Sequence, residues 1–375
     1  MKTTKSPNLR RPIKQLTPGD FIRLYGHQAS YIGGSFTTCE SKTYDSLIPS
    51  GTQKWQGATM GPDGKIYCAP YNSNYVLVID PLNDTAEMKD YGLNLTALGG
   101  SKFQGVIAGN NGLLFCVPFF AAKVLVINPY EQTAVLTDFG LAGMTAQYKW
   151  MSGTLALDGK IYCAPHSVAD ILVIDPIKMT AERTAMGATL SGTDQYGGLS
   201  LSSTGMLYAV PSTATNILKI NPYTGVATTS NYGMTLTGST KWLGAVMGGD
   251  QIMYGIPGNA TDIFQFNTIT ETGVRNNMGA TLPGSLAWNG GGYASDGKIY
   301  CAPRTAGDVL IIDPVTKTAT RDAFSLTWAN TALVDFCMGP DNRLYSIPLS
   351  GTVVRVIGQK SLCNQYFTTP YRNKL

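Results

Sequence analysis

The sequence has few of the residues that enzymes most often use for chemistry. Its 375 residues include only two histidines, His27 and His166, and only 14% of them are charged. Zinc sites and acid–base sites need His, Cys or carboxylate groups close together, and these two histidines lie in unlike contexts. We therefore expect no catalytic residue, no metal ligand and no cofactor, and interpret the chain as a binding or assembly module rather than an enzyme.

Long apolar runs are also missing. The N-terminus lacks the apolar core of a signal peptide, and no run approaches the ~20 residues of a membrane span. The seven cysteines are an odd number, which favours free thiols in a reducing compartment. These features predict a protein that folds in a cytoplasm and has no membrane span.

The two ends of the chain carry most of the positive charge. Residues 1–34 contain six basic residues and one acidic residue, and residues 359–375 contain three basic residues and no acidic one. Basic ends can bind an acidic surface, or they can keep a terminus soluble. We interpret them as arms that dock to neighbouring subunits and recognise no specific nucleic acid. The expected contact residues are Arg10, Arg11, Lys14, Arg23 and Arg372.

A repeat of 45 to 48 residues organises the rest of the chain. The segment Gly64 to Pro70 recurs with modest change, and each copy ends in an anchor proline. An aromatic residue lies 15 residues before six of the seven anchor prolines, and Leu333 takes this place in the seventh unit. The anchors are Pro70, Pro118, Pro165, Pro211, Pro257, Pro303 and Pro348. The aromatic residues are Trp55, Phe103, Trp150, Tyr196, Trp242 and Trp288.

The sequence pattern of each unit is typical of four short strands. Aliphatic and β-branched runs such as 76–79 are bounded by Asp-Gly and Asp-Pro turn signals. Four strands in about 45 residues predict one propeller blade, so seven units predict an all-β, seven-bladed propeller with four antiparallel strands per blade. The expected domains are a basic arm at 1–34, the propeller at 35–358 and a basic tail at 359–375.

The seventh unit lacks a clear fourth strand. The segment 35–44 lies where a fourth strand would precede the first unit, and we expect it to complete the last blade. Pairing the start of the chain with its end removes exposed sheet edges. The stretch 362–368 is a second candidate for the same place.

Two resemblances follow from these motifs. The segments 296–300 and 309–316, Asp-Gly-Lys-Ile-Tyr and Val-Leu-Ile-Ile-Asp-Pro-Val-Thr, resemble the repeats of the YVTN-type β-propeller family. The combination Gly-Lys-Ile-Tyr-Cys-Ala-Pro with Val-Leu-Val-Ile-Asp-Pro is similar to propeller repeats in tailed-phage virion proteins. The first resemblance implies the fold, which hosts many activities. The second implies a virion role.

The predicted central channel is lined mostly by very small residues. The residue two positions after the aromatic residue is glycine or serine in six units and Asp335 in the seventh, and Asn289 lies one residue from this position in its own unit. Small residues are expected where inner strands converge on the axis. Asp335 is interpreted as structural or solvated, and the alternative is that Asp335 and Asn289 hold a channel ion or ligand.

One face of the predicted ring collects the variable loops. The loop entering the first strand and the loop between the second and third strands should lie on the same face, and variable loops on a fixed scaffold are typical of binding surfaces. Lysines around the channel could attract an anionic group, unless they are simply solvated. The candidate contacts are Lys54, Trp55, Tyr71, Asn72, Lys102, Phe119, Phe120, Lys149, His166, Lys241 and Arg304. Phe119 and Phe120 form an apolar patch if exposed, and otherwise fold under a neighbouring blade.

Three functions remain open on the sequence. The favoured one is a tail, collar or fibre protein of a tailed-phage virion, with arms that dock to other virion proteins and a loop face that could meet a host surface molecule. The second is a lactonase-like enzyme or small-ligand binder that uses the channel. The third is a cytoplasmic scaffold that binds protein partners.

Overall fold

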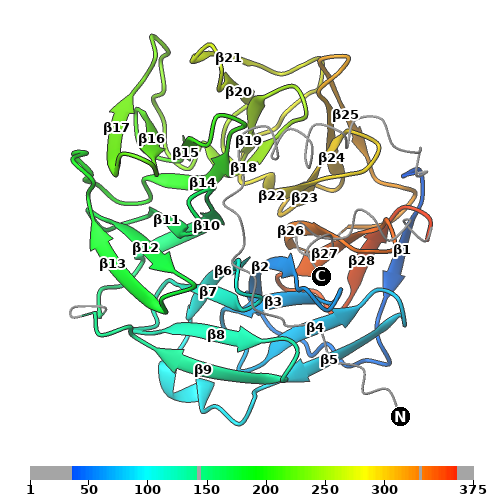
Figure 1. The fold of residues 1–375 in the computed structure, drawn as a ribbon. Coiled ribbons are helices and arrows are strands. Elements are labelled where there is room, and N and C mark those ends of the chain that lie inside the picture. Colours follow the sequence, from blue (N-terminus) through cyan, green and yellow to red (C-terminus); the bar gives the residue numbers. More distant parts are fainter. Residues whose placement is uncertain (1–35, 142–144, 329–331, 361–375) are drawn as a thin grey trace, which may run out of the picture.

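The computed structural model describes residues 36–141, 145–328 and 332–360. In these ranges the chain forms seven four-stranded antiparallel sheets arranged radially around a central axis (Figure 1). The predicted all-β, seven-bladed propeller is confirmed. No helix in the described ranges is long and apolar enough to cross a membrane.

Each blade runs from an inner strand at the axis to an outer strand at the rim. Blades 1 to 3 consist of β2 (Trp55–Met60), β3 (Ile66–Pro70), β4 (Val76–Asp80), β5 (Thr85–Lys89); β6 (Phe103–Ala108), β7 (Leu114–Pro118), β8 (Val124–Asn128), β9 (Thr133–Thr137); and β10 (Trp150–Leu155), β11 (Ile161–Pro165), β12 (Ile171–Asp175), β13 (Thr180–Thr184). Blades 4 to 6 consist of β14 (Tyr196–Leu201), β15 (Leu207–Pro211), β16 (Ile217–Asn221), β17 (Val226–Ser230); β18 (Trp242–Met247), β19 (Ile252–Pro257), β20 (Ile263–Asn267), β21 (Thr272–Asn276); and β22 (Trp288–Tyr293), β23 (Ile299–Pro303), β24 (Val309–Asp313), β25 (Thr318–Asp322). Blade 7 consists of β26 (Leu333–Met338), β27 (Leu344–Pro348), β28 (Val354–Ile357) and β1 (Cys39–Lys42), and a short 3₁₀ helix (Leu95–Leu98) connects blades 1 and 2.

The second strand of each blade is buried on both faces, which explains its apolar sequence. All five residues of β3 are buried, and the Tyr67 hydroxyl donates to Asp63 in the preceding turn at 2.8 Å. Gly64 has a φ of +81°, a conformation that glycine adopts without steric cost. The Asp-Gly-x-x-Tyr pattern thus sets both the turn and the buried end of the strand. The same Tyr–Asp bond recurs at Tyr162–Asp158, Tyr254–Asp250, Tyr300–Asp296 and Tyr345–Asp341.

The turns between the third and fourth strands are stabilised by Asp or Asn side chains. The Asp80 carboxylate accepts hydrogen bonds from the backbone amides of Leu82 and Asn83, both at 3.1 Å. Asn221 does the same for Tyr223 and Thr224. Aspartate and asparagine at this position therefore stabilise turns.

A tryptophan, an arginine and an aspartate brace the loop side of blades 3, 5 and 6. In blade 5, the Trp242 indole donates to the Asp262 carbonyl at 3.1 Å. Arg275 on the outer strand lies 4.9 Å from the Trp242 ring centroid and forms an ion pair of 2.8 Å with the Asp262 carboxylate. One arginine thus ties the outer strand to the loop that precedes the third strand.

The ring closes where the start of the chain meets its end. β1 pairs antiparallel with β28, with Cys39 opposite Ile357, which confirms the predicted closing strand. Arg343 stabilises this seam because its guanidinium bonds Asp341 and Glu40 at 2.6 Å and Asp84 at 2.7 Å. The second candidate for the closing strand, 362–368, lies outside the described residues.

The inner strands approach one another closely at the axis. A Cβ on Gly198 would lie 2.4 Å from the Ala245 nitrogen, and one on Gly290 would lie 2.6 Å from the Val334 carbonyl oxygen. These contacts explain the small residues predicted for the channel lining. The six cysteines in the described part of the chain are free thiols.

Candidate functional site

The two sets of variable loops lie on one face and are bonded to each other around the ring. The Tyr71 amide donates to the Lys54 carbonyl at 2.8 Å within blade 1, and the Lys102 amide of blade 2 donates to the Tyr71 carbonyl at 3.0 Å. Similar bonds continue through Phe119 and Lys149. Each loop is therefore fixed by its neighbour, and together the loops form the channel mouth.

Four of the predicted contact residues are buried rather than exposed. Both interpretations of the mouth lysines placed their ammonium groups within reach of solvent, and the structure corrects this. The side chains lie beneath the loops, where main-chain carbonyls surround the ammonium groups. The exposed fractions are 4% for Lys54, 1% for Lys102, 0% for Lys149 and 3% for Lys241.

The buried ammonium groups connect neighbouring blades. The Lys241 ammonium donates to the carbonyls of Ser212 and Ala214 in the preceding blade, at 2.7 and 3.0 Å, and to Gly238 at 2.9 Å. Such bonds are possible only after the blades pack, which is why the sequence did not reveal them. Burial lowers the pKa of all four lysines to about 8. The residues at this position in blades 4, 6 and 7 are Gln195, Ala287 and Ala332.

Two more predicted contacts have structural roles. Trp55 is fully buried, and its indole donates to the Tyr75 carbonyl at 2.7 Å, so it presents no ring to a partner. Asn72 is exposed, but its amide donates to Thr52 and its carbonyl accepts from the Ser101 amide. Trp55 is therefore corrected to a core residue, and Asn72 links the loops of blades 1 and 2.

Five rings from blades 1, 2 and 3 meet at the mouth. We call Tyr71, Phe119, Phe120, Tyr148 and His166 the aromatic patch. Phe119 lies at its centre, 5.2 Å from His166 and 5.4 Å from Tyr148 between ring centroids, with edge-to-face geometry in both pairs. Phe120 packs on Tyr148 at 4.5 Å, and Tyr148 is 48% exposed. Phe119 and Tyr71 are buried beneath, so the patch offers an apolar outer surface on a fixed base.

Tyr148 was missed in the sequence, although its position carries a signal. It lies two residues before the aromatic residue of its blade, and it has a φ of +54°. The equivalent residues in other blades include Asp194 and Thr240, with φ of +56° and +50°. This left-handed position is variable in sequence, as expected for a residue that faces outward at the mouth.

His166 joins the patch to blade 4 through hydrogen bonds. Its Nε2 lies 2.7 Å from the Asp194 carboxylate, and its Nδ1 lies 2.9 Å from the Ser167 hydroxyl. The second carboxylate oxygen of Asp194 accepts from Thr240 at 3.1 Å. Burial opposes ionisation of Asp194, but the bonds from His166 and Thr240 and the charge of Arg304 outweigh it and lower the pKa of Asp194.

Arg304 reaches the same mouth from blade 6. Its side chain is half-buried, and burial lowers its pKa, while Tyr71 of blade 1 and Asp194 of blade 4 act in the opposite direction. The charge of Arg304 thus favours ionisation of groups on both sides of the mouth, Tyr71 and Asp194. Of the predicted contacts, the structure brings together the rings of Tyr71, Phe119, Phe120 and His166. Arg304 lies in the corresponding loop of blade 6, within electrostatic range of Tyr71 and Asp194.

The channel residues are separate from this site. Asn289 is buried, and Asp335 accepts a hydrogen bond from the Phe336 amide at 2.9 Å. Burial raises the pKa of Asp335 to about 7. Across the described ranges, no group of three or more His, Cys, Asp or Glu side chains could hold a metal ion. The predicted arm contacts Arg10, Arg11, Lys14, Arg23 and Arg372 lie outside the described residues.

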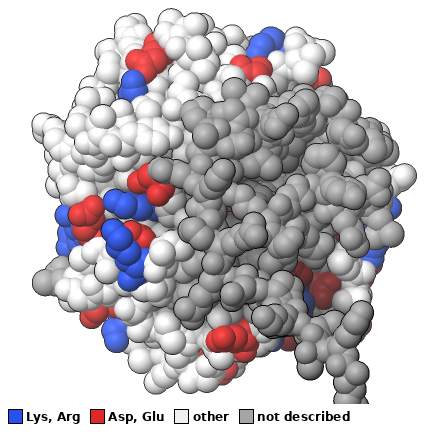
Figure 2. All heavy atoms as spheres, in the orientation of Figure 1, with Lys and Arg blue, Asp and Glu red and all other residues white. Residues whose placement is uncertain are grey.

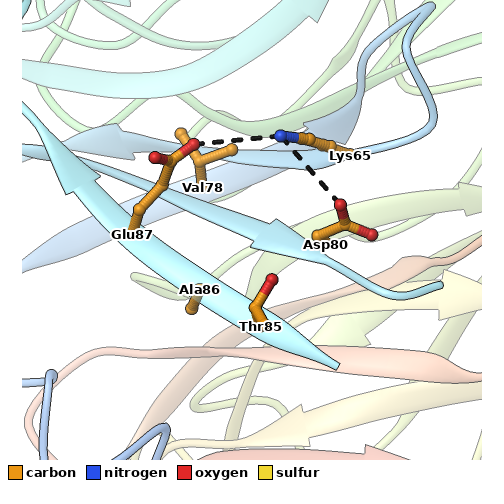
Figure 3. A pocket seen from close by; sticks show the side chains of 6 residues that line it. All are labelled: Lys65, Val78, Asp80, Thr85, Ala86 and Glu87. Atoms are coloured by element: carbon orange, nitrogen blue, oxygen red, sulfur yellow. Dashed lines mark ion pairs between the residues drawn. The ribbon is translucent and has the colours of Figure 1, made fainter. Parts of the chain in front are cut away.

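The remaining surface features are less specific. Where described atoms are visible in Figure 2, basic and acidic side chains lie in small groups of mixed sign. A shallow hollow of about 160 Å³ lies on blade 1, where Lys65 is placed between Asp80 and Glu87 at 4.0 and 3.9 Å (Figure 3). Its lysine is already paired with two carboxylates.

No known family model matches the chain, and no curated protein matches it. Solved structures do share its fold. A streptogramin B lyase has 14% identity and a TM-score of 0.67, over 86% of this chain and 97% of that one. A hydrazine synthase chain of Kuenenia stuttgartiensis has 14% identity and a TM-score of 0.61, over 84% and 98%. YCF48 bound to D1 peptide has 13% identity and a TM-score of 0.60, over 88% and 96%.

These similarities extend over the whole propeller, but at this identity they show the fold alone. The group includes two proteins named for enzymatic activity and one named as bound to a peptide. The fold therefore does not distinguish a catalytic function from a binding function. The distinction has to come from the residues at the mouth.

Proposed function

We propose that this protein is a non-catalytic recognition module that binds a partner at the aromatic patch of the channel mouth. One observation carries the proposal: five rings from three consecutive blades form one contiguous cluster, in which Tyr148 is exposed and Phe120 is half-buried against it. Aromatic residues dominate the binding energy of many interfaces, because they bury a large area with little loss of side-chain freedom. The fixed loops beneath the patch reduce the entropy cost of binding further.

The test compares two double variants on a panel of immobilised peptides and glycans. Phe120→Ser/Tyr148→Ser removes the outer rings of the patch. The control Ile177→Ser/Tyr223→Ser removes two exposed apolar residues from turns at the opposite ends of the strands, where they are 61% and 50% exposed. We expect the patch variant to lose the ligands that wild type and control bind. Equal binding by all three proteins, or no binding by wild type, would contradict the proposal.

We also propose that the partner assembly is a tailed-phage virion. This rests on the resemblance of the repeats to virion propellers and on the basic ends of the chain. Deleting residues 1–34 is expected to abolish incorporation of the protein into particles while the propeller still folds. Normal incorporation of the deleted protein would contradict a docking role for the N-terminal arm.

A second function, acyl transfer, is favoured by the hydrogen bonds around His166. Asp194, His166 and Ser167 are connected in the order found in hydrolases with a serine nucleophile. However, the Ser167 hydroxyl oxygen also lies 3.3 Å from the Asp194 amide and accepts a hydrogen bond from it, as expected for a structural bridge. Labelling by a fluorophosphonate that Ser167→Ala abolishes would favour the enzyme over the recognition module.

A further inference from the structure

Arg304 differs from the other arginines of the described chain. Five of the six form hydrogen bonds through their guanidinium groups: Arg183, Arg275, Arg321, Arg343 and Arg355. Within the described ranges, the Arg304 side chain has neither a hydrogen bond nor an ion pair, although it is half-buried. A partly desolvated guanidinium with five unused donors is a strong site for an oxyanion.

The acidic residue that could neutralise Arg304 is already occupied. Asp194 is close enough for Arg304 to lower its pKa, but its two carboxylate oxygens bind His166 and Thr240. The bonds hold the carboxylate on the blade 4 side of the mouth. Arg304 therefore has no carboxylate from the described chain in ion-pair contact.

The buried lysines make the mouth more positive without competing for a ligand. Their ammonium groups are directed at main-chain carbonyls, as in Lys241 and Lys149. They therefore add to the electrostatic field rather than to the contact surface. Blades 6 and 7, on the Arg304 side, have Ala287 and Ala332 at the lysine position. In the described loops of blades 6 and 7 on this face, Arg304 is the basic residue.

The aromatic patch and Arg304 lie in loops on the same face of the ring. Tyr71 links the two features, because its ring centroid lies 5.9 Å from that of Phe119 at the base of the patch and its hydroxyl is within electrostatic range of Arg304. A ligand that bonds to Arg304 can therefore cover the patch at the same time. The patch and the cation impose two requirements on one ligand: a planar or apolar group and a negative charge close to it.

We propose that the channel mouth binds a carboxylate attached to an aromatic or apolar group, with the carboxylate on Arg304 and the apolar group on the aromatic patch. A small organic acid and the C-terminus of a chain with an apolar last residue share this chemistry. The inference rests on the proposed recognition function and adds the chemical class of the ligand.

The experiment uses three probes in ligand-detected NMR titrations of the full chain. N-acetyl-L-phenylalanine has the ring and the carboxylate, its primary amide has the ring without the charge, and acetate has the charge without the ring. A peptide ending in phenylalanine, with a free or amidated C-terminus, distinguishes a chain end from a small acid. We expect the free acid to bind at least about tenfold more tightly than either the amide or acetate.

Two variants assign the charge preference to one residue. Arg304→Gln is expected to weaken binding of the free acid about tenfold and leave the amide unchanged, because only the acid uses the guanidinium. Lys178→Gln is the matched control, since it removes the same charge from a side chain that is 74% exposed at an outer turn. The control is expected to bind like wild type.

The inference is wrong if acid and amide bind equally, if Arg304→Gln leaves the acid unaffected, or if wild type binds no acid at about 10 mM. The Phe120→Ser/Tyr148→Ser variant separates this failure from failure of the patch. If that variant no longer binds the amide, and wild type shows no preference for the acid, the result supports the patch and refutes the anion site. A preference for the acid that needs Arg304 but not the two rings would keep the anion site and refute the patch.

Discussion

Blade 5 and blade 7 have the same four strands but are held together by different residues. Blade 5 has the full repeat: Lys241 bonds the preceding blade, and Trp242 packs beneath Arg275. Blade 7 has Ala332 and Leu333 at the positions of that lysine and tryptophan. Its last strand comes from the other end of the chain.

The difference shows two ways of joining blades. In blade 5, a buried cation is satisfied by main-chain carbonyls, so the joint depends on loop conformation. In blade 7, Arg343 is satisfied by carboxylates from three segments, so the joint depends on paired charges. We expect the charged joint to be more sensitive to loss of one residue, because a buried carboxylate is left without its partner.

The largest effect is expected for Arg343→Met. Asp341 has no exposed surface and would lose the guanidinium that lies 2.6 Å away. Removing one partner of such a buried pair costs about 3 to 5 kcal/mol. Urea unfolding followed by fluorescence should show this loss in the free energy of unfolding.

The matched control for Arg343→Met is Lys65→Met, at the equivalent position of blade 1. Lys65 pairs at 4.0 and 3.9 Å and is 31% exposed, so a loss below about 1 kcal/mol is expected. Equal losses in the two variants would show that the seam has no special role in stability.

The next effect is expected for Lys241→Met. Three carbonyls lose a charged donor, and water reaches them only in part, so the free energy of unfolding should fall by about 2 to 4 kcal/mol. Lys178→Met, at an exposed turn, should stay within about 0.5 kcal/mol of wild type. If Lys241→Met matches this control, the ammonium groups do not connect the blades.

The ring itself could be predicted because its signals are local. Gly64 and the Asp63–Tyr67 pair lie within one turn, and the same Tyr–Asp bond recurs in five of the seven blades. The ends of the chain could be joined because the seventh unit lacked one strand. These features follow from short-range turn chemistry and from the period of the repeat.

The chemistry of the mouth could be predicted only in part, because it depends on contacts between blades. From the sequence, Lys241 is predicted to be a surface cation, because its hydrogen-bond acceptors lie in the loop of the preceding blade. His166 and Arg304 were recognised from their variable loops, but Asp194 became visible only when blade 4 packed beside blade 3. Glu40 and Arg343 likewise meet only after the ring closes.

A smaller effect is expected at Asp335, which replaces the glycine of blade 5. An unfolded aspartate ionises near pH 4, whereas burial raises the pKa of Asp335 to about 7. Between these values the folded state retains a proton that the unfolded state releases, so this group makes stability fall as the pH rises from 4 to 7, and the loss is complete above pH 7.

Asp335→Asn removes this titration and keeps an oxygen that can accept from the Phe336 amide. We expect the variant to be more stable than wild type by about 1 to 3 kcal/mol at pH 8, with little difference at pH 4. Thermal unfolding of both proteins across this pH range measures the difference in their free energies of unfolding. The other carboxylates titrate in both proteins, so their contributions cancel in this difference. A constant difference at all pH values would show that Asp335 does not titrate with a raised pKa.

The smallest effect is expected for Arg275→Met in blade 5. Arg275 and Asp262 are each partly exposed, so loss of their ion pair and of the contact with Trp242 should cost about 0.5 to 1 kcal/mol. The double variant Arg275→Met/Asp262→Asn tests this in a mutant cycle, because it leaves no unpaired carboxylate. A cost near that of Arg343→Met would mean that blade 5 also depends on paired charge, and the contrast between the two blades would no longer hold.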